Sequence, residues 1–285
     1  MSGFAKSVLA GAGAALLALA SSGCSAVQTG AASTAAPLAV DQKSVKVAMP
    51  QGTADALLFS PHARGKFPAI LLWTDITGLR PAFAQVGRNL AARGYVVLVP
   101  NMFYRSAAIS GALPQPTLTQ AEVRERSSKW TGEITDQAAE TDARAYFAYL
   151  DRLPIVDTAR KAGTLGYDFG SPYAFHAAMA LPERIGAVAV LHPFRIATER
   201  PNSPHLFVNR SKSAYFVALA KPDDEREPGD KDDLRRAFAA AGLPGTVTVY
   251  PAGHGFAVPD QGAYDPVVAQ QAWEAVVAFF NANLR

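Results

Sequence analysis

Short apolar runs alternate with helical patterns from about residue 44 onward, and this alternation restricts the fold more than any other feature of the sequence. Most runs are largely apolar, as strands buried on both faces of a parallel sheet are. Strands that alternate with helices predict an α/β sheet covered on both faces. We therefore expect one domain, residues 44–285, built on a mostly parallel eight-stranded sheet. The expected strands are Val45–Ala48, Ala56–Phe59, Ala69–Trp73, Tyr95–Val99, Gly163–Gly166, Ala187–Leu191, Tyr215–Leu219 and Thr246–Tyr250.

The helices between these runs have recognisable ends. Pro81 stands where a first helical turn tolerates proline, and Gly94 and Gly242 stand where helices commonly stop. The last helix is expected to start at Asp265-Pro266. It should turn four apolar side chains inward, namely Trp273, Val276, Val277 and Phe280.

Composition excludes several classes of protein. Of the 285 residues, 49% are hydrophobic and 18% are charged, which suits a buried core and excludes a disordered chain. The net charge of +3 comes with no long basic block, so nucleic acid is not an expected partner. Cys24 is the only cysteine, which excludes an internal disulfide and any multi-cysteine metal site.

The first residues resemble an export signal. Lys6 precedes an uncharged apolar run, Val8–Ala20, whose 13 residues are too few to span a bilayer as a helix. Cys24 follows a stretch that is similar to a bacterial lipobox, so we expect residues 1–23 to be removed and Cys24 to be lipidated. The alternative is a secreted protein with an incidental cysteine. Residues 24–43, rich in Ala, Ser and Thr, are expected to form a flexible tether.

The stretch Gly166–Gly170 (GYDFG) is the most informative motif. An apolar strand enters it and an Ala-rich helix leaves it, as in the elbow of α/β-hydrolases, where small flanking residues allow a strained turn that exposes the central side chain. The central residue is Asp168. By itself, the motif could also be a turn whose aspartate caps a helix.

Two later positions complete the order nucleophile, acid and histidine, each following a strand. Asp223 is our first candidate for the acid and Asp224 the second, and His254 lies in Gly-His-Gly-Phe. His192, which follows another strand, is a weaker candidate for the pocket lining. The remaining candidates are expected to be structural: Ser171, His176 and His205.

At this point the chain resembles the dienelactone hydrolase family over about residues 45–283. The motifs that carry the resemblance are Trp73–Leu79 (WTDITGL), Ala92–Tyr95 (ARGY) with Pro100–Arg105 (PNMFYR), the Gly-Tyr-x-x-Gly elbow and Gly253–Phe256 (GHGF). The resemblance implies an α/β-hydrolase fold and a hydrolase without a cofactor or metal.

The resemblance also implies roles for individual residues. Asp75 takes the place of an acidic residue that contacts the nucleophile. The backbone N–H groups of Ile76 and Phe169 would form the oxyanion hole. Arg105 would face a substrate carboxylate, and Tyr104 would lie beside the substrate.

Two positions depart from the family. The usual nucleophile is Cys, whereas this chain has Asp168, and the family's second arginine is Val258 here. A carboxylate attacks saturated carbon well, as in haloalkane dehalogenases and epoxide hydrolases, but attack on an ordinary ester would give an anhydride. Asp168 could instead act as a base for water. Phe169 stands where the dehalogenases usually have tryptophan.

The sequence therefore predicts an exported, lipid-anchored hydrolase of the bacterial periplasm. It would act on a small ester, lactone or related electrophile through Asp168, His254 and Asp223. The alternative is an envelope lipoprotein that only binds a ligand in the same pocket. We also expect Asp75 and Asp168 to face each other and to share a proton. The oligomeric state stays open.

Overall fold

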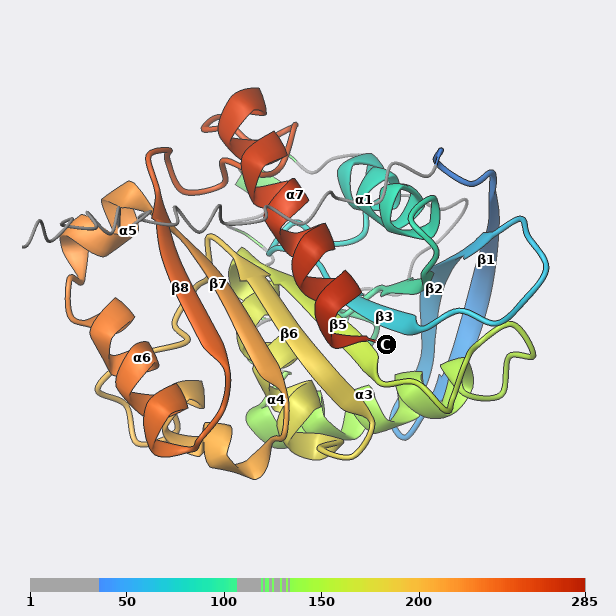
Figure 1. Ribbon diagram of the computed structural model, residues 1–285, viewed down its shortest axis with the longest axis horizontal. Helices are drawn as coiled ribbons and strands as arrows, with labels where there is room; N and C mark the ends of the chain where they lie inside the picture. Colours follow the sequence, from blue (N-terminus) through green and yellow to red (C-terminus); the bar gives the residue numbers. More distant parts are fainter. Residues whose placement is uncertain are drawn as a thin grey trace, which may run out of the picture. The chain divides into compact units, whose positions relative to one another are not determined.

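The structure is a computed structural model that describes residues 36–106, 119, 121, 122, 125, 129, 132 and 134–284. The described residues form one eight-stranded sheet in the order β1-β2-β4-β3-β5-β6-β7-β8 (Figure 1). The strands are β1 (Val40–Met49), β2 (Gly52–Pro61), β3 (Ala69–Trp73), β4 (Val96–Pro100), β5 (Ala162–Tyr167), β6 (Ile185–Leu191), β7 (Ala214–Ala220) and β8 (Gly245–Tyr250). The helices are α1 (Pro81–Ala91), α3 (Asp136–Leu150), α4 (Ser171–Ala180), α5 (Lys221–Arg226), α6 (Asp230–Ala240) and α7 (Pro266–Asn283), with 3₁₀ turns η1 (Asp168–Gly170) and η2 (Pro204–Arg210).

The sheet is mostly parallel, as predicted. Strand β2 pairs antiparallel with both β1 and β4, and all other neighbours are parallel. All eight expected strands are confirmed. The first begins earlier than expected, because residues 40–43 of the predicted tether pair with residues 58–61 of β2. Their side chains are half-buried or exposed, so hydrophobicity gave no signal for this part of the strand.

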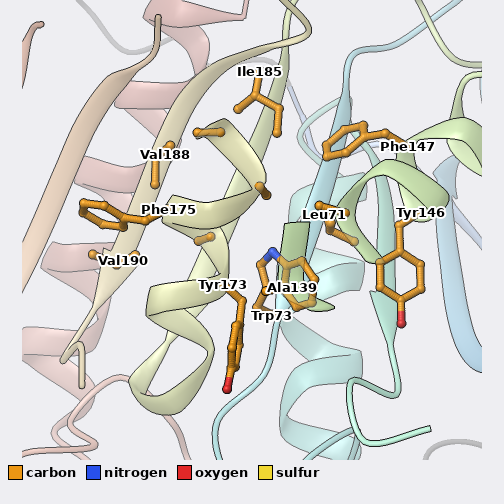
Figure 2. Close-up of a cluster of buried hydrophobic side chains, with 14 of the residues drawn as sticks. Leu71, Trp73, Ala139, Tyr146, Phe147, Tyr173, Phe175, Ile185, Val188 and Val190 are labelled. Atoms are coloured by element: carbon orange, nitrogen blue, oxygen red, sulfur yellow. The ribbon is translucent and has the colours of Figure 1, made fainter. Parts of the chain in front are cut away.

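Helices cover both faces of the sheet and create two cores. Helices α1 and α7 pack on one face, and α3, α4 and α6 pack on the other (Figure 1). Figure 2 shows part of the second core, where Trp73 of β3 lies near Tyr146 of α3 and Tyr173 of α4. The central strands β3 to β7 are buried on both sides, which explains why they read as unbroken apolar runs.

The predicted helix ends are observed. Pro81 occupies the first turn of α1, and the Asp265 side chain accepts hydrogen bonds of 3.0 Å from the backbone N–H groups of Val267 and Val268 at the start of α7. Gly94 and Gly242 have left-handed φ angles of 91° and 66°, which glycine adopts at little cost. None of the described helices is long and apolar enough to cross a membrane.

Two glycines allow β3, β5 and α4 to approach each other at the elbow. A Cβ atom at Gly170 would lie 2.3 Å from the backbone oxygen of Thr74, and one at Gly166 would lie 2.7 Å from Cα of Ser171. Backbone atoms cannot move aside as a flexible side chain can. The elbow therefore requires glycine at both positions.

Because of this close approach, we expect a single methyl group added at the elbow to destabilise the fold. Gly170→Ala should lower the free energy of unfolding by about 1–3 kcal/mol, measured by urea denaturation, because it overpacks a fixed backbone contact. Gly262→Ala is the matched control, since a Cβ at Gly262 meets nothing within 4 Å. An equal loss in both variants would contradict the explanation.

Candidate active site

Five polar side chains converge at the carboxyl edge of the sheet, where ligands bind in open α/β folds. Asp75 follows β3, Asp168 follows β5 and His192 follows β6. Asp223 lies in the first turn of α5, directly after β7, and His254 follows β8. The parallel strands bring together residues that are far apart in the sequence.

Asp168 occupies a strained turn. Its φ of 43° lies in the left-handed region, which is unusual for a residue with a side chain. The turn is held by a hydrogen bond of 3.1 Å from the backbone N–H of Phe194 to the backbone oxygen of Asp168. The strand-to-helix turn therefore presents the carboxylate outside the sheet, in the manner of a nucleophile elbow.

His254 bridges two carboxylates. Its Nε2 lies 3.0 Å from Oδ1 of Asp168, and its Nδ1 lies 2.6 Å from Oδ2 of Asp223. Asp224 points elsewhere and binds Nζ of Lys231 at 2.8 Å. The structure thus places the first candidate acid at the histidine and engages the second in a separate ion pair.

The two carboxylates change the charge of the imidazole. Burial alone would lower the pKa of His254, but the hydrogen bonds and negative charges of Asp168 and Asp223 raise it to about 9. Burial would raise the pKa of Asp223, but hydrogen bonds from His254 and Arg226 lower it overall. At neutral pH the histidine is therefore an imidazolium that donates from both nitrogens.

The two expected oxyanion donors lie beside Asp168. Ile76, Phe169 and Asp168 line the same cavity of about 750 Å³. The backbone N–H of Ile76 makes no hydrogen bond to any described residue. A free N–H next to the nucleophile position is the donor that a developing oxyanion needs.

Asp75 is neutralised by Arg80, a residue that sequence analysis missed. Arg80 binds both carboxylate oxygens of Asp75, at 2.6 and 2.8 Å, and both oxygens of Asp260, at 2.8 Å each. Burial would lower the pKa of Arg80, but hydrogen bonds to Asp260 and Asp75 raise it. The Asp75 carboxylate also accepts a hydrogen bond of 3.1 Å from Gln261.

This network adds a partner that the sequence did not suggest. Asp75 and Asp168 line one small cavity, and the Arg80 guanidinium is paired with Asp75 there. Asp260 lies 180 positions from Arg80 in the sequence, and no spacing rule connects the two. The sequence signal for this network was Arg80 itself, which directly precedes the helix-starting Pro81.

Arg105 and Tyr104 do not lie where the resemblance placed them. The guanidinium of Arg105 binds both oxygens of the buried Asp142, each at 2.7 Å, and contacts Gln51. The hydroxyl of Tyr104 donates to the same carboxylate at 2.9 Å. Neither residue lines the three cavities that meet at Asp168, because Asp142 on α3 holds both side chains.

His192 lies next to His254. Its ring centroid is 5.3 Å from that of His254, and its side chain is buried. Burial and the neighbouring His254 lower the pKa of His192 to about 3, so this imidazole is neutral. The candidates expected to be structural are buried: Ser171 and His176 in α4 and His205 in η2.

Three cavities meet at Asp168. Two are large, with volumes of about 750 and 1240 Å³, and Arg195 and Arg200 line both. The third, which we call the small chamber, has about 180 Å³ and is lined by Asp75, Ile76, Thr77, Asp168, His192, His254, Gly255 and Gln261. The site thus offers two large spaces and one small space that share Asp168 in their linings.

Two other expectations concern regions or groups outside this site. Among the described residues, no group of three or more His, Cys, Asp or Glu side chains could hold a metal ion. The predicted signal, residues 1–23, and the lipidation site Cys24 lie outside the described residues.

Comparison with known proteins agrees with this geometry. A carboxymethylenebutenolidase from Rhodococcus opacus is 26% identical over 227 residues, covering 77% of this chain and 83% of the relative. The dienelactone hydrolase from Anabaena variabilis superposes with a TM-score of 0.61 at 17% identity, over 86% of this chain and 99% of that structure. A dienelactone hydrolase-like promiscuous phosphotriesterase from metagenomic libraries gives a TM-score of 0.71 at 18% identity, over 87% and 100% of the two chains. The profile of the dienelactone hydrolase family matches residues 54–284, and the chain belongs to that family.

Proposed function

We propose that this protein hydrolyses a small ester, lactone or related electrophile through Asp168, His254 and Asp223. The observation that carries the proposal is the hydrogen-bonded chain from Asp168 through His254 to Asp223, at the base of cavities large enough for a small molecule. Membership in a family of hydrolases supports the same conclusion.

The resting charges favour attack by Asp168 itself. A carboxylate is already anionic, so the first step requires no base. In that step Asp168 forms a bond to the electrophilic carbon, and the leaving group departs with its electron pair. The product is an ester on Asp168. Ile76 and Phe169 stand beside this position to stabilise negative charge on oxygen.

Formation of that ester changes the state of His254. The neutral ester removes one of the two negative charges that raise the histidine's pKa. The imidazolium then loses its proton more readily and becomes a base that can activate water. Asp223 still accepts from Nδ1 and keeps Nε2 toward the ester. The same histidine can therefore be an acid at rest and a base in the second step.

The chemistry of the nucleophile restricts the substrate. A carboxylate suits electrophiles that open at saturated carbon, including a lactone whose alkyl C–O bond breaks. For cleavage at an acyl carbon, Asp168 would instead act as a base for water, with the His254 imidazolium protonating the leaving group. Both routes end in hydrolysis, and isotope labelling distinguishes them.

A second function is favoured by one observation. A histidine whose pKa is about 9 between two carboxylates is a stable ion-pair bridge, and such a bridge can simply shape a ligand-binding pocket. In that case the protein would bind a small molecule without turnover. Replacement of Asp168 or Asp223, the two ends of the bridge, distinguishes hydrolysis from binding without turnover.

The raised pKa of His254 predicts a pH-dependent stability. Folding raises this pKa from its ordinary 6.5 to about 9, so the ion pairs contribute fully below pH 6.5 and are lost as pH rises through about 9. The difference in unfolding free energy between wild type and His254→Gln should therefore shrink from pH 6.5 to 9. A constant difference over this range, measured by denaturation, would contradict the assigned charge.

Heavy-oxygen water tests the covalent route. In a single turnover in labelled water, the label should enter the Asp168 carboxylate, because water attacks the ester at that carbon. His254→Ala should lower kcat by at least about 100-fold and trap the ester, which intact-protein mass spectrometry detects. Label that appears only in the product would indicate the base route.

A neighbouring pair of aspartates supplies the control. Asp223→Asn should lower kcat because His254 loses its orienting carboxylate, whereas Asp224→Asn should keep a rate close to wild type. Wild-type rates in both Asp168→Ala and His254→Ala would exclude catalysis by this chain of residues and leave the binding function.

We further propose that the protein is exported and anchored to a bacterial membrane, with its hydrolase domain in the periplasm. The support is the apolar run Val8–Ala20 followed by Cys24, the only cysteine of the chain. A diacylated cysteine holds a protein at a membrane through its buried acyl chains.

Substitution of the anchor residue tests this proposal. Cys24→Ser should move the protein from the membrane fraction to the soluble fraction or block its processing, as fractionation and mass spectrometry of the N-terminus would show. A wild-type protein that is soluble and cleaved after Ala20 would contradict lipidation.

A further inference from the structure

His192 has a buried imidazole ring next to His254. Neither of its ring nitrogens makes a hydrogen bond to any described residue, and the residue is 1% exposed. Buried polar atoms in native proteins nearly always have a partner, which is either protein or ordered water. We therefore expect the two ring nitrogens to bind a ligand that can both donate and accept hydrogen bonds.

The backbone holds His192 in this position at a cost. Its φ of 36° lies in the left-handed region, and its N–H donates to the backbone oxygen of Ala218 at 2.7 Å. The ring packs edge-on against Tyr167, His254 and Phe256, with centroids 5.3–5.7 Å away. A strained residue beside the elbow is more consistent with function than with packing alone.

The small chamber is the space that His192 faces. Of the three cavities that meet at Asp168, only this one includes His192 in its lining. Asp75, Thr77 and Gln261 line it as well, so it offers several polar groups. Its 180 Å³ exceeds what one water needs, and a buried water also needs polar partners of this kind.

The chamber also touches the reacting groups. Asp168 and His254 both line it, whereas His254 does not line the cavity of 750 Å³. A molecule in the chamber therefore lies beside both reacting side chains.

We propose that the small chamber holds the hydrolytic water and that neutral His192 positions this water against Asp168 and His254. This inference rests on the proposed hydrolase function. The neutral state of His192, held by burial, suits the task because one nitrogen can donate while the other accepts.

Water then hydrolyses the ester on Asp168. The water oxygen bonds to Cγ of the Asp168 ester, and one water proton moves to Nε2 of His254. The bond from Cγ to the alkyl oxygen then breaks, and that oxygen takes the proton from His254. Asp168 is left as an acid, and it returns its proton to His254, which restores the resting ion pair. His192 keeps its own proton throughout and acts as a positioning residue.

His192→Leu tests the inference, since leucine fills similar space but cannot hold water. We expect kcat to fall at least about 10-fold and KM to fall with it, so that kcat/KM stays close to the wild-type value, because only the step after ester formation is slowed. The burst that reports ester formation should persist, and the ester should accumulate. His192→Asn, which restores a donor and an acceptor, should recover part of kcat. His176→Leu, which removes another buried histidine, is the matched control and should keep the wild-type kcat.

The outcomes separate this inference from the proposed function. An unchanged kcat in His192→Leu, or a raised KM with normal kcat, would overturn the role of His192 while leaving the hydrolase function intact. A wild type that turns over no ester, lactone, haloacid or epoxide would remove both. A high-resolution crystal structure gives an independent readout. Ordered water within hydrogen-bond distance of a His192 nitrogen supports the inference, and a dry chamber contradicts it.

Discussion

The site depends on one imidazolium held between two carboxylates. Asp168, His254 and Asp223 come from the segments after three different strands, and their two hydrogen bonds fix these segments relative to one another. Because the elbow residue is a carboxylate rather than a thiol, the histidine binds its proton more tightly, with a pKa of about 9. The Asp at the elbow therefore sets the resting charge of the site and, in the mechanism that we propose, the order of its proton transfers.

A second ion-pair network supports the first. Arg80 is buried and joins Asp75, next to the proposed oxyanion donor Ile76, to Asp260 in the loop that carries His254. Burying one carboxylate without a partner would be costly, but the bidentate pairs and the hydrogen bonds to Asp75 satisfy it. This network positions the two halves of the site without touching a substrate in the larger cavities.

The pocket also departs from the arrangement that the family resemblance implied. Arg105 binds Asp142, while Arg195 and Arg200 line the two large cavities beside Asp168. His192 lines only the small chamber of the three. The described residues thus form two large spaces and one small space that share Asp168 in their linings, and the proposed hydrolysis needs room for both an electrophile and a water.

The sequence alone determined the eight strands, the elbow at Asp168 and the order of Asp223 and His254, because buried strands and glycine-flanked turns leave local patterns. It did not determine which aspartate meets the histidine, since a shift of one residue changes no pattern. The roles of Arg80, Asp142 and Asp260 were decided by tertiary structure. Ion pairs between residues as far as 180 positions apart form only when strand order brings their loops together, and no local spacing records that order.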